Sequence, residues 1–411
     1  MADAARFIRI FFTLVLGVLI VTSSINLVVD PLGLFGMPTW RGFNAEKTQY
    51  QKYLRMAKPH AVRMLKPGGL ILGTSRAENV DPGHPGWHAG AQPVYNMAIQ
   101  SSRIHEVLRN LQHAQAQHRL AQVVLFLDDF MFDPRTPSEE GFEEARLDRE
   151  RTPRINMAWL DDMVMALLSY DALAESITTV SSQGQKVSVL YLANGAHDPS
   201  RLQGAVDQKG GHRKMFLEQV RPAGREFTGD DSAPYEAFRA MLAFCRKNNI
   251  DLRLAINPMH AHMLELYWLN GAWEKLENWK RRLARIVEQE FADSHAGKPF
   301  PLWDFANYNS ITTESVPPLG DTTTRMRWYW ESSHYKSAVG QLMLDRILAD
   351  HSAPQDPRQS FGIAVRLGNI ESHLQSIRAQ HAEYALSHQA DISEIVRKKE
   401  EVLRPIAGIQ E

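Results

Sequence analysis

The sequence places a serine, a histidine and a glutamate in settings that suit acyl-transfer chemistry. Ser75 directly follows a short apolar run, and its hydroxyl needs a nearby base to become a nucleophile. His334 has an acid at a useful spacing, because Glu331 precedes it by three residues in Trp-Glu-Ser-Ser-His. Such an acid on a loop can accept the imidazole N–H and fix its tautomer. We therefore predict a catalytic group in which Ser75 attacks, His334 removes its proton and Glu331 orients the imidazole.

Short apolar runs with helical segments between them predict the elements that position these groups. The first run, residues 68–73, ends just before Ser75, and ligands of α/β sheets bind at the carboxyl ends of strands. The alternation indicates βαβ units, so the expected fold class is α/β, with a doubly wound, mostly parallel sheet flanked by helices. Further strands are expected at 93–97, 122–127, 186–193 and 251–256. Helices are expected at about 47–57, 103–118, 155–180, 235–248, 263–295, 335–350 and 368–403.

Two motifs resemble blocks of the SGNH/GDSL hydrolase superfamily. Residues 73–76 (Gly-Thr-Ser-Arg) match its serine block, and residues 331–334 (Glu-Ser-Ser-His) match its D-x-x-H block. Residues 95–100 stand where a second block contributes an oxyanion N–H, which the resemblance assigns to Ala98. The resemblance covers residues 65–350. It is strongest to a membrane-anchored envelope branch, similar to alginate O-acetylation and teichoic-acid D-alanylation proteins.

The chain departs from that family pattern around the expected oxyanion site. Thr74 replaces the aspartate before the serine, and Ala98 stands near an expected glycine. The third block has Asp128 and Asp129 instead of an asparagine. An asparagine amide donates to an oxyanion, whereas an ionised aspartate repels it. Glu331 in place of aspartate is a milder change, because it adds only one methylene of reach.

Several other polar residues are candidates for the site, each with a structural alternative. Arg76 suits either an anionic sugar or a structural carboxylate. Asn257 and His260 follow a predicted strand and suit either substrate contact or a turn that starts a helix. Asp304 is an alternative partner for the imidazole. His260 and His262 have no carboxylate at a convincing ligand spacing, so we expect no metal and no cofactor.

The start of the chain predicts a membrane anchor. Residues 10–29 carry no charge, and about 20 helical residues span a hydrocarbon core of about 30 Å. Arg6 and Arg9 precede this run and Asp30 follows it, so the positive-inside rule puts the bulk of the chain outside the cytoplasm. We expect a single-pass protein of the bacterial inner membrane that faces the periplasm. A cleaved signal peptide and a buried soluble helix are the alternatives.

Composition excludes several classes of protein. The 411 residues include 46 Lys and Arg against 47 Asp and Glu, so no overall basic field favours nucleic acid. The single cysteine, Cys245, excludes an intrachain disulfide and a multi-cysteine metal site. We divide the chain into an anchor (1–30), a lead-in (31–66), an SGNH-like domain (67–352) and a helical extension (353–411). The extension is expected to pack on the domain.

The resemblance implies a serine acyltransferase or esterase that acts on an envelope or secreted polysaccharide, with acetyl as the acyl group. Its expected partners are the polysaccharide or acyl donor, the inner membrane through residues 10–29, and a membrane-bound acyltransferase or export complex. The main alternative is a non-catalytic SGNH-like subunit that binds polysaccharide or acts as a scaffold. A soluble lipase-like esterase is a third hypothesis. An α/β-hydrolase is disfavoured, because in that fold several strands precede the serine.

Overall fold

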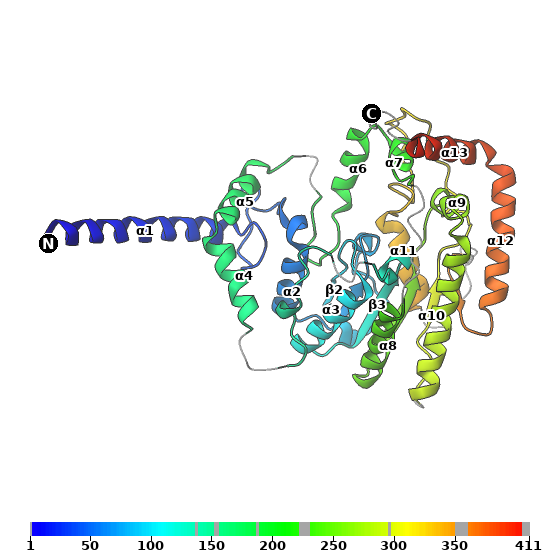
Figure 1. Ribbon diagram of the computed structural model, residues 1–411, viewed down its shortest axis with the longest axis horizontal. Helices are drawn as coiled ribbons and strands as arrows, with labels where there is room; N and C mark the ends of the chain where they lie inside the picture. The colour runs from blue at the N-terminus through cyan, green and yellow to red at the C-terminus, as the bar shows by residue number, and fades with distance from the viewer. Residues whose placement is uncertain are drawn as a thin grey trace, which may run out of the picture.

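A six-stranded sheet forms the centre of the computed structural model, which describes residues 2–135, 139–151, 156–185, 189–221, 231–294, 297–349 and 361–404 (Figure 1). The strand order is β2-β1-β3-β4-β5-β6. Strands β1 to β5 are parallel, and β6 joins β5 in the antiparallel direction. The strands are β1 (Gly69–Leu72), β2 (Val94–Asn96), β3 (Gln122–Leu127), β4 (Asp251–Ile256), β5 (Leu302–Asp304) and β6 (Ile363–Val365).

The two faces of the sheet are both covered, which explains why its central strands are apolar throughout. On β3, Val123 and Leu125 point into one buried cluster, whereas Val124 and Phe126 point into another. The first cluster is closed by α3 (Ile104–Gln117), α8 (Ser232–Lys247), α10 (Trp273–Ser294) and α12 (Ile370–Ser387). The second is closed mainly by α11 (Ser337–Leu348).

The predicted α/β class and mostly parallel sheet are confirmed, but several element predictions were wrong. The helical stretches expected at 263–295 and 368–403 are each interrupted, at residues 270–272 and at His388. Of the strand expected at 186–193, residues 186–188 lie outside the described part of the chain. Its remainder forms one antiparallel bridge, from Tyr191 to His197, and joins no sheet. The helix expected at 155–180 is two helices, α4 (Met157–Leu168) and α5 (Tyr170–Ser181). They are separate because Ser169 ends the first and caps the second, accepting a hydrogen bond from the Ala172 N–H.

The lead-in also differs from expectation. The helix expected at 47–57 is a 3-10 turn at Tyr50–Tyr53 followed by α2 (Leu54–Leu65), which continues through Pro59. Pro59 is buried against the domain, and its carbonyl accepts a hydrogen bond from His113, so tertiary contacts hold this part of the helix in place.

The C-terminal helices pack on the domain. Helix α12 contacts α10, and Leu374 and Ile377 join the first buried cluster. Helix α13 (Gln389–Leu403) contacts α9 (Ala261–Leu269). Arg213 on α7 (His212–Glu218) also pairs with Asp391 and Glu394 of α13. Helix α6 (Pro199–Gln208) precedes α7. The boundary predicted at residue 352 falls outside the described residues.

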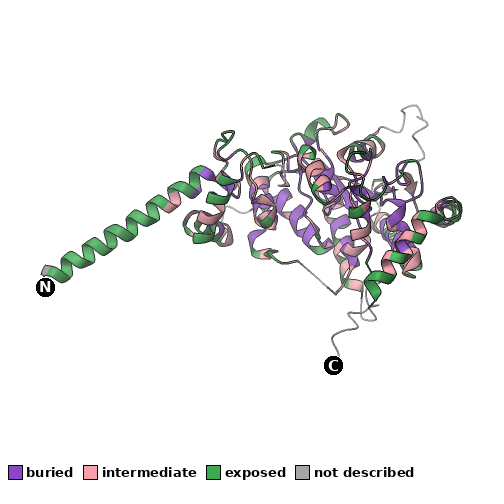
Figure 2. Cartoon of the chain, turned by 90° about the horizontal axis from the view of Figure 1, so that it is seen from above, coloured by how far each residue is buried: buried purple, intermediate pink, exposed green. Residues whose placement is uncertain are grey.

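Helix α1 (Ala2–Val29) projects from one end of the domain, as Figure 1 shows. Its span from Asp3 to Val29 is long and apolar enough to cross a membrane, and only 11% of its most apolar window is buried (Figure 2). The helix ends at Asp30, whose carboxylate accepts hydrogen bonds from the Leu34, Phe35 and Met37 N–H groups. The chain therefore turns sharply where the apolar run stops.

Candidate functional site

Ser75 lies just beyond the carboxyl end of β1, between β1 and β3. Strand β2 lies on one side of β1 and the later strands on the other, so this is the switch point at which doubly wound sheets bind ligands. The turn depends on Gly73, which has a φ of +150°. A Cβ there would lie 2.8 Å from the Ala77 Cβ and 3.0 Å from the Phe126 carbonyl oxygen. Glycine thus lets the serine turn pass close to β3.

His334 and Glu331 lie together on one tight loop. An antiparallel bridge between Tyr329 and Tyr335 closes this loop, and the Trp330 N–H donates to the His334 carbonyl at 2.9 Å. His334 Nδ1 is hydrogen-bonded to Glu331 Oε1, and the other Glu331 oxygen accepts the Ser333 N–H at 2.7 Å. The acid therefore holds both the imidazole and the loop backbone.

The structure brings the three predicted residues into one hydrogen-bonded chain. His334 Nε2 lies 2.8 Å from Ser75 Oγ, within the range for proton transfer. Glu331 is 2% exposed, whereas the His334 side chain is 33% exposed. Burial raises the pKa of Glu331, but the charge of His334 and the hydrogen bonds from His334 and Ser333 lower it by more. The pKa of Glu331 therefore lies below its usual value. The acid is thus buried and ionised while the base faces solvent.

Arg76 ties the serine turn to the histidine loop. Its guanidinium pairs with the Asp128 carboxylate, and its Nε and Nη2 donate to the Ser333 carbonyl and Oγ at 3.0 Å each. Burial alone lowers the pKa of Arg76, but Asp128 raises it above the usual value. Of the two roles expected for Arg76, the structure shows the pairing with a structural carboxylate.

Asp128 and Asn257 take internal positions instead of facing a ligand. Asp128 Oδ2 accepts hydrogen bonds from the Thr74 hydroxyl at 2.5 Å and from Asn257 Nδ2 at 3.0 Å. Asn257 Oδ1 in turn accepts the Tyr335 hydroxyl at 2.9 Å. This network joins the ends of β1, β3 and β4. Asp128, which stands in the third block of the resemblance, and Asn257, a candidate for substrate contact, thus have their side-chain polar atoms engaged with the protein.

The oxyanion donor expected at Ala98 is also engaged internally. Its N–H donates to Asn96 Oδ1 at 3.0 Å, and Lys58 Nζ holds the carbonyls of both Asn96 and Ala98. Burial lowers the pKa of Lys58 to about 8. The Ser75 N–H, by contrast, makes no hydrogen bond to any described residue. It is the donor best placed to stabilise a negative oxygen beside Ser75.

His260 is a helix cap, the second of the two roles expected for it. Its Nδ1 accepts the His262 N–H at the start of α9, and its Nε2 donates to the Glu314 carbonyl at 2.7 Å. Burial lowers the pKa of His260 to about 4, so the ring is neutral at neutral pH. Within the described ranges, no cluster of three His, Cys, Asp or Glu side chains suits a metal ion.

Asp304 does not replace Glu331 as the partner of His334. Its carboxylate pairs instead with Lys280 on α10, at 2.7 Å, and with His373 on α12, at 2.9 Å. Burial raises the pKa of Asp304, but these two partners lower it to about 2.

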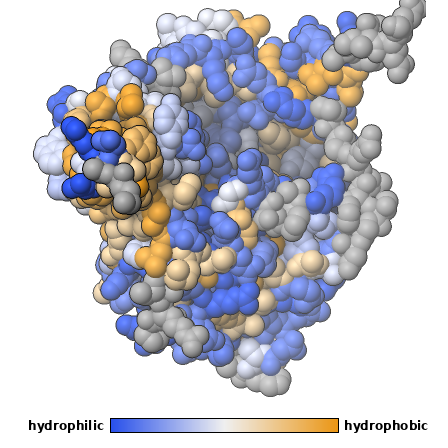
Figure 3. Space-filling model, turned by 60° about the vertical axis from the view of Figure 1, so that its left-hand side comes forward, coloured by the Kyte–Doolittle hydropathy of each residue, from blue (hydrophilic) through white to orange (hydrophobic). Residues whose placement is uncertain are grey.

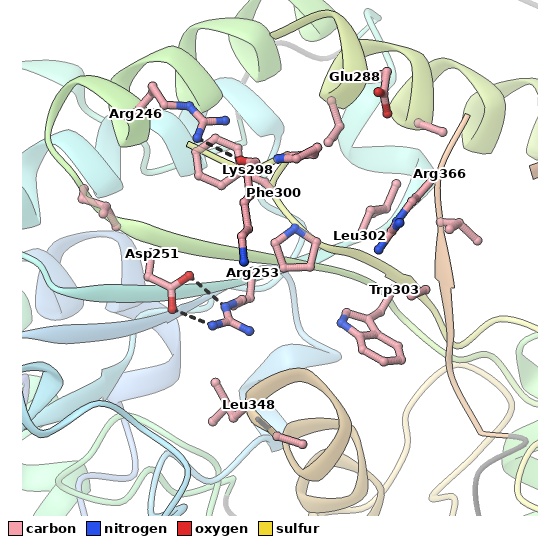
Figure 4. Close-up of a pocket in the computed structure, with 18 of the residues that line it drawn as sticks. Arg246, Asp251, Arg253, Glu288, Lys298, Phe300, Leu302, Trp303, Leu348 and Arg366 are labelled. Atoms are coloured by element: carbon pink, nitrogen blue, oxygen red, sulfur yellow. Dashed lines mark hydrogen bonds and ion pairs between the residues drawn. The ribbon is translucent and has the colours of Figure 1, made fainter. Parts of the chain in front are cut away.

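A cavity of about 1270 Å³ lies at the end of the sheet opposite to Ser75 (Figure 4). Its lining includes Asp251 and Arg253 at the start of β4, and Leu302 at the start of β5. Strands β1, β4 and β5 are parallel, so this cavity lies at the amino ends of the strands, whereas Ser75 follows a carboxyl end. It contains none of the Ser75, His334 and Glu331 side chains.

Three residues of the site were missed by sequence reasoning. The Ser333 carbonyl accepts a hydrogen bond from Arg76. The Thr74 hydroxyl donates to Asp128, and the Tyr335 hydroxyl donates to Asn257. Thr74 and Ser333 lie within the two motifs, and Tyr335 directly follows the second. Their position next to Ser75 and His334 in the sequence was therefore the one indication that they belong to the site. Comparisons of the chain with protein-family models and with curated proteins give no match.

Proposed function

We propose that this chain is a membrane-anchored serine acyltransferase or esterase of SGNH type, facing the periplasm and acting on an envelope or secreted polysaccharide. The observation that carries the proposal is the hydrogen-bonded chain from Ser75 Oγ through His334 to buried Glu331. The choice of a polysaccharide as substrate and of acetyl as the acyl group rests on the resemblance to SGNH hydrolases. The orientation follows from Arg6 and Arg9 before the apolar helix.

The geometry supports a two-step acyl transfer. His334 Nε2 takes the Ser75 hydroxyl proton as Oγ attacks the acyl carbonyl, and ionised Glu331 stabilises the resulting imidazolium. The Ser75 N–H donates to the carbonyl oxygen as it becomes negative. The imidazolium then returns its proton to the leaving group. In the second step, a sugar hydroxyl or water loses its proton to His334 and attacks the acyl-serine. The bond between the acyl carbon and Oγ then breaks, and the imidazolium returns the proton to Ser75 Oγ.

The test is covalent labelling of the full chain in detergent by a fluorophosphonate, a probe that phosphonylates activated serines. We expect the wild type to be labelled and Ser75→Ala and His334→Ala to lose labelling. Ser372→Ala and His105→Ala, at exposed positions of α12 and α3, are matched controls that should label as the wild type does. A folded wild type that resists the probe, or Ser75→Ala protein that still reacts, would refute the proposal and favour a non-catalytic subunit.

A further inference from the structure

Helices α4 and α5 expose their apolar side chains. On α4 the exposed residues follow helical spacing along one face, and on α5 they continue after the bend. Tyr170 and Ile177 of α5 are 81% and 62% exposed. The apolar residues exposed on α4 are Met157, Val164, Met165 and Leu168.

The buried sides of the same helices are polar or small. Asp162 of α4 is buried in an ion pair with Arg146, and α5 buries Ser176 and Thr179. A helix on the surface of a domain in water normally has the opposite arrangement, with its apolar stripe toward the core. Two consecutive helices with inverted polarity indicate that their outer faces meet an apolar medium.

These helices lie at the base of the membrane helix. Both contact α1, and Asn26 of α1 joins them, donating to the Leu167 carbonyl and accepting the Ser176 hydroxyl, each at 2.9 Å. Figure 1 shows α4 and α5 flanking the end of α1, and Figure 3 shows hydrophobic side chains gathered around this end of the molecule.

An aromatic residue from the lead-in lies at the same level. Trp40 is 50% exposed. The backbone N–H of Trp40 donates to Asn44 Oδ1, and the Asn44 amide donates in turn to the Val28 carbonyl at the end of α1. Tryptophan and tyrosine are enriched where a membrane meets water, so Trp40 and Tyr170 suit that boundary.

We propose that α4 and α5 lie in the headgroup region of the same bilayer that α1 crosses, with their exposed apolar faces covered by lipid. Each helix has 12 residues, or about 18 Å, too short to cross a core of about 30 Å. The two are bent by 60° at Ser169, as suits a pair lying along a surface. Asp161 and Asp171 are exposed beside the apolar residues, which limits the depth to the headgroups.

The experiment places a single nitroxide label on the full chain in vesicles of phosphatidylethanolamine and phosphatidylglycerol. Val164→Cys and Ile177→Cys test the two helices. Leu386→Cys is the matched control, because Leu386 is apolar and 76% exposed, and its helix α12 lies at the other end of the molecule from α1 (Figure 1). Cys245, the only native cysteine, is fully buried and does not compete for the label.

Collision rates with oxygen, which concentrates in lipid, and with a water-soluble nickel chelate report what covers each label. We expect oxygen to dominate at positions 164 and 177 and nickel to dominate at 386. Nickel access at 164 and 177 equal to that at 386 would overturn the proposal, because those faces would then be in water. Low access to both reagents would also overturn it, because a protein partner or second copy would cover the helices. Thermal unfolding confirms that each labelled chain is folded.

Discussion

Replacing Arg76 by methionine separates a structural role from direct substrate binding. Methionine keeps much of the side-chain volume but removes every hydrogen bond from Arg76 to Asp128 and Ser333. Asp128 is only 2% exposed. Its buried carboxylate would still accept hydrogen bonds from two neutral donors, Thr74 and Asn257, but it would have lost its cationic partner. Removing one partner of such a buried pair costs about 3–5 kcal/mol of unfolding free energy.

The second substitution identifies the charge as the cause. Adding Asp128→Asn removes the uncompensated charge and leaves an unpaired amide N–H, which costs about 1–3 kcal/mol. The double variant should therefore be more stable than Arg76→Met alone by about 2 kcal/mol. Arg325→Met is the matched control, because it breaks an exposed pair with Asp207 that contributes at most about 1 kcal/mol.

Thermal unfolding of the full chain in detergent, followed by circular dichroism, measures these differences. At about 2 °C for each kcal/mol, Arg76→Met should lower Tm by about 6–10 °C. The reasoning fails if Tm falls by less than about 2 °C, or if Asp128→Asn recovers nothing. A stable Arg76→Met protein with normal fluorophosphonate labelling but weak turnover of an anionic polymer would instead assign Arg76 to the substrate.

Three further predictions use other parts of the site and its supports. Glu331→Gln should slow fluorophosphonate labelling by about 10³- to 10⁴-fold in protein that still folds, because the amide cannot stabilise the imidazolium and its NH₂ faces one of the two N–H groups that the carboxylate accepts. Because the pKa of Asp304 is held near 2, its pairing with Lys280 and His373 stabilises the fold above about pH 4 and is lost as pH falls toward 2. Tm should drop over this interval in the wild type and less in Asp304→Asn. Lys58→Met should lower the unfolding free energy by about 3 kcal/mol, measured by urea titration, because buried carbonyls lose their donor.

Apolar runs predicted the central strands well because those strands are buried on both faces. The ranges expected for β3 and β4 match the structure residue for residue. Strands β5 and β6 were both missed, and each has only three residues. The described part of the run 186–193 misled because Tyr191 serves loop packing: its ring lies against Tyr50 at a tilted angle, and its hydroxyl donates to Glu78.

The positions of the site residues were easier to predict than their partners. Ser75, His334 and Glu331 were placed by strand ends and by short motifs, which are local features of the sequence. The partners of Arg76, Asp128 and the Ala98 N–H depend on where separate loops converge, and one sequence contains no local signal for that. Asp128 shows the difference, since its residue type argued against an oxyanion donor but did not reveal its pairing with Arg76.

The distance along the chain between the nucleophile and its base has a consequence for folding. Glu331 and His334 share one short loop, but Ser75 is 259 residues from His334. Contacts between such distant segments form late, because closing a long loop costs entropy before the contact is gained. In a partly folded chain, Glu331 and His334 would already be close together, but Ser75 would still be distant from them and unreactive. A serine probe added at intervals during refolding would therefore time the completion of folding, which helix content alone does not report.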